Sequence, residues 1–278
     1  MKKKDYAINN FKKTISIIKC PICNSNINID CNSLVCVKNH TFDLSKKGVV
    51  ILNKNIHLKK DKIYNKNLFL NRREIINNNF YCEIHKYISN FIKNKSLKII
   101  VDMGCGEGSH DNAILKKCPD VFIIGIDLSK DAIDLSSDYL FDNFLGIVSD
   151  INKMPLKDKT IDLVINILSP SNEEEINRVL KKEGYIIKVT PKKEYLCELR
   201  RCLHIDDYEN EELIEKNIKR KYIIEEKIVI NKTYNLKENF GKYICGMTPL
   251  TNNINIEKVK LQKITISLNI YLLRIKKK

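Results

Sequence analysis

The sequence predicts an α/β fold, a doubly wound parallel sheet, preceded by a small metal-binding module. From residue 97 onward, apolar β-branched runs alternate with helix-type patterns, as in a parallel sheet covered by helices on both faces. A glycine-rich turn with Gly104, Gly106 and Gly108 follows the first of these runs. Closely spaced cysteines, beginning with Cys20 and Cys23, occupy the first 40 residues and indicate a separate small unit.

Length and composition fit this division. A chain of 278 residues with a hydrophobic fraction of 43% is long enough for one large α/β domain and a small accessory module. No window approaches the roughly 18 unbroken apolar residues that a membrane helix requires. The N-terminus lacks the apolar segment of a signal peptide. We therefore expect a cytoplasmic protein without a membrane partner.

The formal net charge of +15 suits a polyanionic partner, because neutralised phosphates release counterions and add affinity. Scattered lysines, including the C-terminal Lys276, Lys277 and Lys278, are equally compatible with a solvated surface. Charge alone therefore leaves nucleic-acid binding open.

The cysteine spacing predicts a structural zinc site. Cys20 and Cys23 place two thiolates on one turn, and Cys36 and His40 can close a tetrahedron around the metal. Cys31 could replace His40 in a four-thiolate set, but the spacing from Cys36 to His40 mirrors the first pair more closely. Four protein ligands leave no position for an activated water. Ten cysteines in a reducing compartment favour metal or free thiols over disulfides.

The segments around this module have weaker signals. Residues 1–19 are predicted to form a loose leader, and residues 42–52 a short hairpin that leads outward. Residues 53–73 are polar and cationic, typical of a linker or an RNA-facing loop. Residues 74–93 carry apolar side chains at helical spacing. Tyr81, on the polar side of this predicted helix, is expected to face a ligand or the surface.

The glycine turn joins a predicted strand at residues 97–103 to a helix at residues 109–117. A dinucleotide fingerprint would place its third glycine at position 109, which is serine. Asp102 and Glu107 would repel a pyrophosphate and attract a ligand that carries an ammonium and a sulfonium. S-adenosylmethionine is therefore the ligand that this turn favours.

Acidic residues also follow the next two predicted strands. Asp127 ends the strand at residues 121–127, where it would accept hydrogen bonds from ribose hydroxyls. Ser129 fits the N-cap of the next helix. Asp150 follows a strand at residues 144–148 and is expected to receive the adenine amino group. Further strands are predicted at residues 162–168, 184–189, 222–230 and 263–273, the last two pairing with each other, with a helix at 173–180.

This series of acids and glycines resembles the class I S-adenosylmethionine-dependent methyltransferases, whose Rossmann-like sheet has seven strands with the last antiparallel. Together with the zinc module, the chain resembles the RlmA family of bacterial 23S rRNA (guanine-N1)-methyltransferases, which includes tylosin-resistance enzymes. The residues that carry the resemblance are Cys20 to Cys23, Cys36, His40 to Asp43, 47–52, Arg72, Arg73, Tyr81, 102–108, 125–130, Thr190, Pro191 and 246–250.

The resemblance implies transfer of a methyl group from S-adenosylmethionine to N1 of a guanine in a 23S rRNA hairpin, by a homodimer. It implies a zinc-binding RNA-recognition module at residues 1–52, a linker and helical segment at 53–96 and a methyltransferase domain at 97–278. The cofactor contacts of the family correspond to Tyr81, Gly106, Glu107 and Tyr195. At the position of Tyr195, relatives have histidine. Further departures are Lys182 and Glu183 in place of proline and glycine before the fifth strand, and Ser169 in place of alanine after the fourth.

No catalytic residue is identified from the sequence. Guanine N1 carries a proton that needs an acceptor, and the pattern does not name one. The turn after the fourth strand lacks the Asp/Asn-Pro-Pro-aromatic motif of exocyclic-amine methyltransferases, which favours a ring nitrogen. Cys105 and Cys118 are interpreted as packing residues, and His85 and His110 as surface or core residues.

Two other functions remain compatible with the pattern. One is a small-molecule methyltransferase that acts on an antibiotic or a quinone. The other is a noncatalytic zinc-containing RNA-binding protein.

Overall fold

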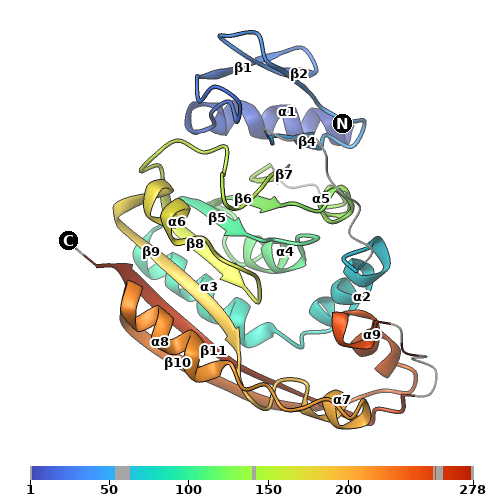
Figure 1. The fold of residues 1–278 in the computed structure, drawn as a ribbon. Coiled ribbons are helices and arrows are strands. Elements are labelled where there is room, and N and C mark those ends of the chain that lie inside the picture. The colour runs from blue at the N-terminus through green and yellow to red at the C-terminus, as the bar shows by residue number, and fades with distance from the viewer. Residues whose placement is uncertain (1, 54–62, 140–141, 253, 255–258, 277–278) are drawn as a thin grey trace.

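The computed structural model describes residues 2–53, 63–139, 142–252, 254 and 259–276. A large mixed sheet runs through the middle of the molecule, and a small antiparallel ribbon lies at one end (Figure 1). The ribbon consists of β1 (Ile27–Asp30), β2 (Ser33–Cys36) and β3 (Thr41–Asp43). The strands of the large sheet follow in the order β10 (Tyr222–Asn235), β11 (Lys263–Ile275), β9 (Leu180–Pro191), β8 (Ile161–Ile167), β5 (Ile99–Met103), β6 (Phe122–Asp127), β7 (Phe144–Val148) and β4 (Val50–Ile51).

The six strands from β9 to β4 are parallel, and β11 is antiparallel to both β9 and β10. Strands of such a sheet are apolar on both faces because helices cover both, which explains their unbroken apolar runs. The predicted pairing of the last two strands is confirmed. The expected seven strands are present, and β4 adds an eighth by pairing with β7 (Val50 with Ile147).

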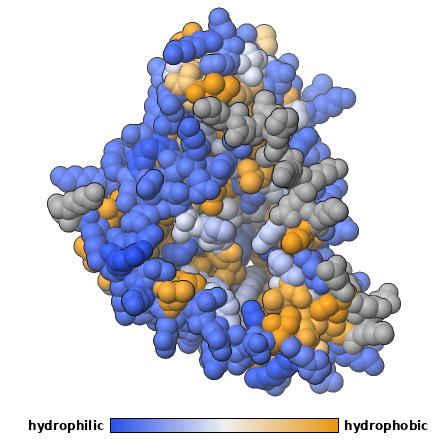
Figure 2. All heavy atoms as spheres, viewed as in Figure 1, coloured by the Kyte–Doolittle hydropathy of each residue, from blue (hydrophilic) through white to orange (hydrophobic). Residues whose placement is uncertain are grey.

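Helices cover the two faces of the large sheet and bury two hydrophobic clusters. One cluster includes side chains from α2 (Lys66–Asn77), α3 (Cys82–Lys95), α4 (Ser109–Leu115), α7 (Cys197–Cys202) and α9 (Gly241–Gly246). The other includes side chains from α1 (Lys3–Thr14), α6 (Glu173–Val179) and α8 (Glu211–Lys221). The helix α5 (Lys130–Ser136) packs near β6 and β7. Hydrophilic residues dominate the face shown in Figure 2, and apolar side chains gather near α9.

The predicted loose leader is wrong, because most of it forms α1. Phe11 is fully buried in the same cluster as residues of β4 and β7. The side-chain amide of Asn10 donates to the carbonyl of Phe144, 2.7 Å away. The N-terminal helix is therefore part of the packing on the large sheet.

The predicted outward hairpin at residues 42–52 is also wrong. Phe42 lies in β3 and is paired with Leu34 of the ribbon, whereas Val50 and Ile51 join the large sheet. Burial of both apolar segments explains the difference, since a short exposed hairpin would leave Val50, which is fully buried, in water.

The predicted loop at residues 53–73 and the single helix at residues 74–93 need correction. Residues 54–62 lie outside the described part of the chain, but α2 begins at Lys66 with Asn65 as its N-cap. The helix ends at Asn77, and α3 starts at Cys82 after Asn79 adopts a positive φ of 65°. This break buries Tyr81, which is 4% exposed, instead of leaving it on a polar face.

Within the described residues, no helix has the length and apolar character that crossing a membrane requires.

Candidate active site and metal centre

The ribbon brings together the four side chains that the spacing predicted as metal ligands. The ligand atoms of Cys20, Cys23, Cys36 and His40 all lie within 4.8 Å of one another. The Sγ atoms of Cys23 and Cys36 are 3.7 Å apart, and Nδ1 of His40 is 3.3 Å from Sγ of Cys36. Cys31 is exposed in the turn between β1 and β2 and is not in this group. The structure therefore favours His40 over Cys31.

The chemistry of this cluster fits a structural zinc ion. Three thiols and one imidazole are a common tetrahedral zinc set, and a complete protein set leaves no position for a reactive water. The hydroxyl of Ser25, 3.0 Å from Sγ of Cys23, helps to lower the pKa of that thiol to about 6. A thiol that ionises near neutral pH is prepared to bind a metal.

The glycine turn joins β5 to α4 at the carboxyl edge of the sheet. Gly104 and Gly106 have positive φ values of 83° and 59°, which favour glycine. A Cβ atom at Gly104 would lie 2.4 Å from Oγ of Ser169, so the loop that follows β8 already fills the space beside Gly104. A Cβ atom at Gly106 would have no neighbour nearer than 3.7 Å. Gly106 is thus the glycine whose backbone a ligand can approach.

Asp127 stands at the end of β6, directly beside this turn. Its carboxylate accepts hydrogen bonds from the backbone N–H groups of Gly106 (2.9 Å) and Ser129 (2.8 Å). The hydroxyl of Ser129 accepts from Ala132, which confirms it as the N-cap of α5. Asp127 therefore holds two loops of the carboxyl edge in place.

Asp102 meets a second acid that the sequence analysis missed. Asp102 in β5 and Asp111 in α4 are 2% and 0% exposed. Within the described residues, Oδ1 of Asp102 and both carboxyl oxygens of Asp111 receive no hydrogen bond from any group other than the neighbouring acid of this pair. Burial raises the pKa of Asp102 to about 7, and raises that of Asp111 well above its usual range. Because both carboxyl groups are almost fully buried, the pair is stabilised when at least one member is protonated.

Glu107 is not free to act as an unpaired charge. Its Oε2 accepts from Nε of Arg73 (2.9 Å) and from the hydroxyl of Ser109 (2.8 Å). Arg73, from α2, also binds Asp138 at 2.9 Å and lies 4.9 Å above the ring of Tyr139. The guanidinium therefore neutralises Glu107 and fastens α2 to the glycine turn.

Tyr81 and Tyr195, which are far apart in the sequence, meet in the structure. Their hydroxyl oxygens are 2.7 Å apart. The neighbouring Arg72 donates from Nε to the carbonyl of Met247 (2.9 Å), and its guanidinium lies 5.7 Å from the centre of the Phe69 ring. The segment around Met247 thereby joins α2 beside the tyrosine pair.

Asp150 follows β7 on the same edge as Asp127, because Asp127 and Val148 are partners in the sheet. Its carboxylate accepts from the backbone and side-chain N–H groups of Asn152, at 2.8 and 2.9 Å. The adjacent Ser149 donates to the carbonyl of Leu52, 2.6 Å away, which connects this loop to the segment after β4.

The ends of β8 and β9 hold a buried polar network that the sequence analysis also missed. The amide of Asn166 donates to the carbonyl of Met103 (2.8 Å), and Nζ of Lys188 donates to Oδ1 of Asn166 (2.6 Å). Burial lowers the pKa of Lys188 to about 8. This network fixes the loop at Ser169, whose hydroxyl also donates to Met103.

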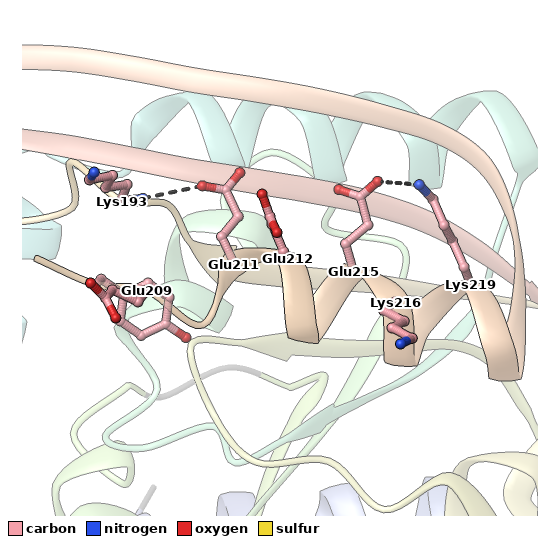
Figure 3. A pocket seen from close by; sticks show the side chains of 8 residues that line it. Lys193, Glu209, Glu211, Glu212, Glu215, Lys216 and Lys219 are labelled. Carbon is pink, nitrogen blue, oxygen red and sulfur yellow. Dashed lines mark hydrogen bonds and ion pairs between the residues drawn. The ribbon is translucent and has the colours of Figure 1, made fainter.

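A separate pocket lies over α8 and is lined mainly by acids and lysines (Figure 3). Glu211 accepts from the backbone N–H of Lys193, and Glu215 is paired with Lys219 at 2.7 Å. These carboxylates are engaged within the chain, and none of them belongs to the glycine-turn edge. We therefore place the candidate active site at the carboxyl ends of β5 to β8.

The parallel sheet with its acidic, glycine-lined edge is typical of the methyltransferase class of α/β proteins. The Cys3His ribbon adds a zinc-binding module to it. A family model described as a methyltransferase domain matches residues 94–242, and one described as the N-terminal part of RlmA, a zinc ribbon, matches residues 18–53. The chain belongs to the RlmA-type 23S rRNA (guanine-N1)-methyltransferase family.

Individual relatives agree with this family. A putative 23S rRNA (guanine-N(1)-)-methyltransferase of Bacillus subtilis is 34% identical over 74% of this chain and 77% of its own. A 23S rRNA (guanine(748)-N(1))-methyltransferase of Streptomyces fradiae is 25% identical over 68% of each chain. Among solved structures, a putative methyltransferase from Bacillus halodurans aligns with 64% of this chain and 92% of its own, at 15% identity and a TM-score of 0.44.

Proposed function

We propose that this chain transfers a methyl group from S-adenosylmethionine to N1 of a guanine in a 23S rRNA hairpin. The observation that carries the proposal is the union in one chain of the Cys3His ribbon and the methyltransferase sheet. Family models match both parts, and a relative named for this activity is 34% identical over 74% of the chain. The loop after β8, Ser169 and Pro170, lacks the aromatic turn of exocyclic-amine enzymes and supports a ring nitrogen as the acceptor.

The proposed cofactor site lies at the carboxyl edge of β5, β6 and β7. Asp127 would receive the ribose hydroxyls, and Asp150 the adenine amino group. Asp102, near the end of β5, would stabilise the ammonium through its negative charge. The full proposed set is Tyr81, Asp102, Gly104, Gly106, Glu107, Asp127, Asp150 and Tyr195.

S-adenosylmethionine would supply an electrophilic methyl group on a sulfonium. The chain itself then needs to position the acceptor in line with that group, and no nucleophilic side chain is required. Guanine N1 is normally paired, so the base must be unpaired or flipped out of its helix. The loop fixed by Asn166 and Lys188 would form one wall of the acceptor site.

The zinc-binding module would contribute to RNA recognition. We propose the boundaries 1–52 for this module, 53–96 for the linker and helical segment, and 97–278 for the methyltransferase domain. The net charge of +15 supports a phosphate-rich partner. Because ribosomal RNA is the proposed substrate, we also propose a cytoplasmic location, and the family resemblance supports a homodimer.

The test is methylation of 23S rRNA by the purified chain with labelled S-adenosylmethionine. Primer extension on the product would stop at the modified base, since N1 methylation blocks the base-pairing edge. The same stop should vanish from the rRNA of cells that lack the protein. Transfer to an antibiotic or quinone without transfer to rRNA would refute the proposal. Binding of RNA without any calorimetric binding of S-adenosylmethionine would support a noncatalytic protein instead.

A further inference from the structure

Two histidines that show no paired spacing in the sequence form a hydrogen-bonded pair in the structure. Nε2 of His85, in the first turn of α3, is 2.8 Å from Nδ1 of His110, near the start of α4. Their ring centres are 5.1 Å apart. His85 is 3% exposed, whereas His110 is only half-buried, so His110 is the accessible member of the pair.

The surroundings favour the neutral form of both rings. Burial lowers the pKa of His85 to about 4, and the positive charge of Lys117 adds to this effect. Burial also lowers the pKa of His110 well below its usual value, with His85 and Arg72 as further causes. A hydrogen bond between two neutral imidazoles requires one ring to donate and the other to accept. When Nδ1 of His110 donates to His85, Nε2 of His110 is left as an unprotonated acceptor.

His110 also lies next to the proposed cofactor residues. Its ring packs edge-on against Tyr81, with the ring centres 5.4 Å apart. The hydroxyl of Tyr81 binds that of Tyr195. His110 follows Gly108, the last glycine of the turn, by two positions. The partly exposed imidazole of His110 therefore lies beside Tyr81, one of the proposed cofactor residues, and at the start of the helix that follows the glycine turn.

We propose that His110 is a catalytic residue whose Nε2 accepts the N1 proton of the target guanine, and that His85 is a positioning residue that fixes the tautomer of His110. The inference rests on the proposed function. In the step, the N1–C bond forms as the S–C bond of the sulfonium breaks. The N1 proton passes to Nε2 of His110, and S-adenosylhomocysteine leaves. The N1 proton becomes more acidic as the methyl group bonds, so an imidazole of lowered basicity is sufficient.

The test compares His110→Gln, His85→Gln and the control His204→Gln, which replaces an exposed histidine. The rate constant kcat is measured on 23S rRNA at saturating S-adenosylmethionine. We expect His110→Gln to lower kcat by about 10²-fold, as for loss of a general base, with unchanged affinity for S-adenosylmethionine by calorimetry. His85→Gln should shift the acid limb of the pH–rate profile, which a purely structural role would not move. His204→Gln should match the wild type.

Wild-type kcat in His110→Gln would overturn the inference. So would a variant that loses cofactor affinity at least tenfold but keeps kcat at saturation, since His110 would then be a cofactor contact. If His110→Gln loses the wild-type circular dichroism spectrum, the wild-type pH profile decides. A single acid limb below pH 6.5 supports the inference, and a limb at or above pH 6.5 overturns it. An inactive wild type would instead refute the proposed function itself, and the inference with it.

Discussion

The hydroxyl groups of Tyr81 and Tyr195 are 2.7 Å apart, although 114 residues separate them in the chain. Tyr81 directly precedes α3, and Tyr195 lies in the loop between β9 and α7. Their contact ties the segment before α3 to the loop after β9, and each segment supplies one of the proposed cofactor residues.

Removing this hydroxyl contact should weaken cofactor binding without unfolding the chain. A neutral hydrogen bond contributes about 1 kcal/mol, so Tyr81→Phe and Tyr195→Phe should each raise the Kd for S-adenosylmethionine about fivefold. The double variant should be little worse than either single one, because both remove the same contact. Calorimetry on the wild type, the two single variants and the double variant gives the coupling free energy between the hydroxyls. Strictly additive losses of binding free energy would show that the hydroxyls act independently.

Replacing Asp127 should abolish cofactor binding. The carboxylate is the proposed ribose partner and also receives two backbone N–H groups of the site loops. Asp127→Ala should therefore lose measurable binding of S-adenosylmethionine in calorimetry while keeping the wild-type circular dichroism spectrum. Asp131→Ala, which removes an exposed acid four residues later, is the control. Wild-type affinity in Asp127→Ala would exclude the ribose role.

The raised pKa of Asp102 makes the stability of the cofactor-free chain depend on pH. Because the folded pKa of about 7 exceeds the ordinary value of 3.8, the folded chain holds this proton more tightly than the unfolded chain. The resulting stability is fully present below about pH 4 and is lost as the pH rises through 7. The loss amounts to about 4 kcal/mol at most.

Urea unfolding of the wild type and of Asp102→Asn at pH 5 and pH 8 measures this effect. The difference between the free energies of unfolding of the two proteins cancels the contribution of the titrating groups that they share. The free energy of unfolding of the wild type, relative to the variant, should fall between pH 5 and pH 8. An equal difference at both pH values would mean that Asp102 does not titrate in this range.

The same carboxyl group predicts that cofactor affinity depends on pH. A bound ammonium favours the ionised form of Asp102, so binding of S-adenosylmethionine should tighten as the pH rises from 6 to 8. Calorimetry in two buffers of different ionisation enthalpy should show proton release on binding at pH 6.5. No proton release there would argue against the ammonium as the partner of Asp102.

Removing zinc should unfold the ribbon, because three short strands have too few residues for a core of their own. A strong chelator, or Cys23→Ser, should abolish amide protection in β1 to β3, measured by hydrogen exchange. Cys31→Ser should retain both the metal and the protection, since Cys31 lies outside the cluster. Loss of zinc in Cys31→Ser would instead show that Cys31, and not His40, is the fourth zinc ligand.

Breaking the pair between Arg73 and Glu107 should destabilise the fold. Glu107 is 3% exposed, and Arg73→Gln would leave its charge buried without a cation, at a cost of about 3 kcal/mol. Thermal unfolding measures the loss, with Arg201→Gln as the control because Arg201 is exposed. A Tm equal to that of the wild type would show that Ser109 alone satisfies Glu107.

The sequence by itself determined the elements whose signals are local. Apolar runs gave the strands of the large sheet, because strands buried on both faces must be apolar throughout. Residue spacing gave the metal ligands Cys20, Cys23, Cys36 and His40, since a tetrahedral zinc site restricts where its ligands can stand. The sequence also identified the acids at the ends of the first three strands of the methyltransferase sheet. Parallel strands end on one edge of a sheet, so acids at those ends are expected to lie together.

Only the tertiary structure decided the pairs that join distant segments. The helix α1 was predicted as a leader, because its mixed sequence acquires an apolar partner only when Phe11 packs on the sheet. No regular spacing in the sequence indicates which residues of these pairs meet. The pairs are Tyr81 with Tyr195, Arg73 with Glu107, Asp102 with Asp111, and His85 with His110. Their contacts depend on how α2, α3 and α4 pack together, and side-chain packing between elements is set by the whole fold rather than by local periodicity.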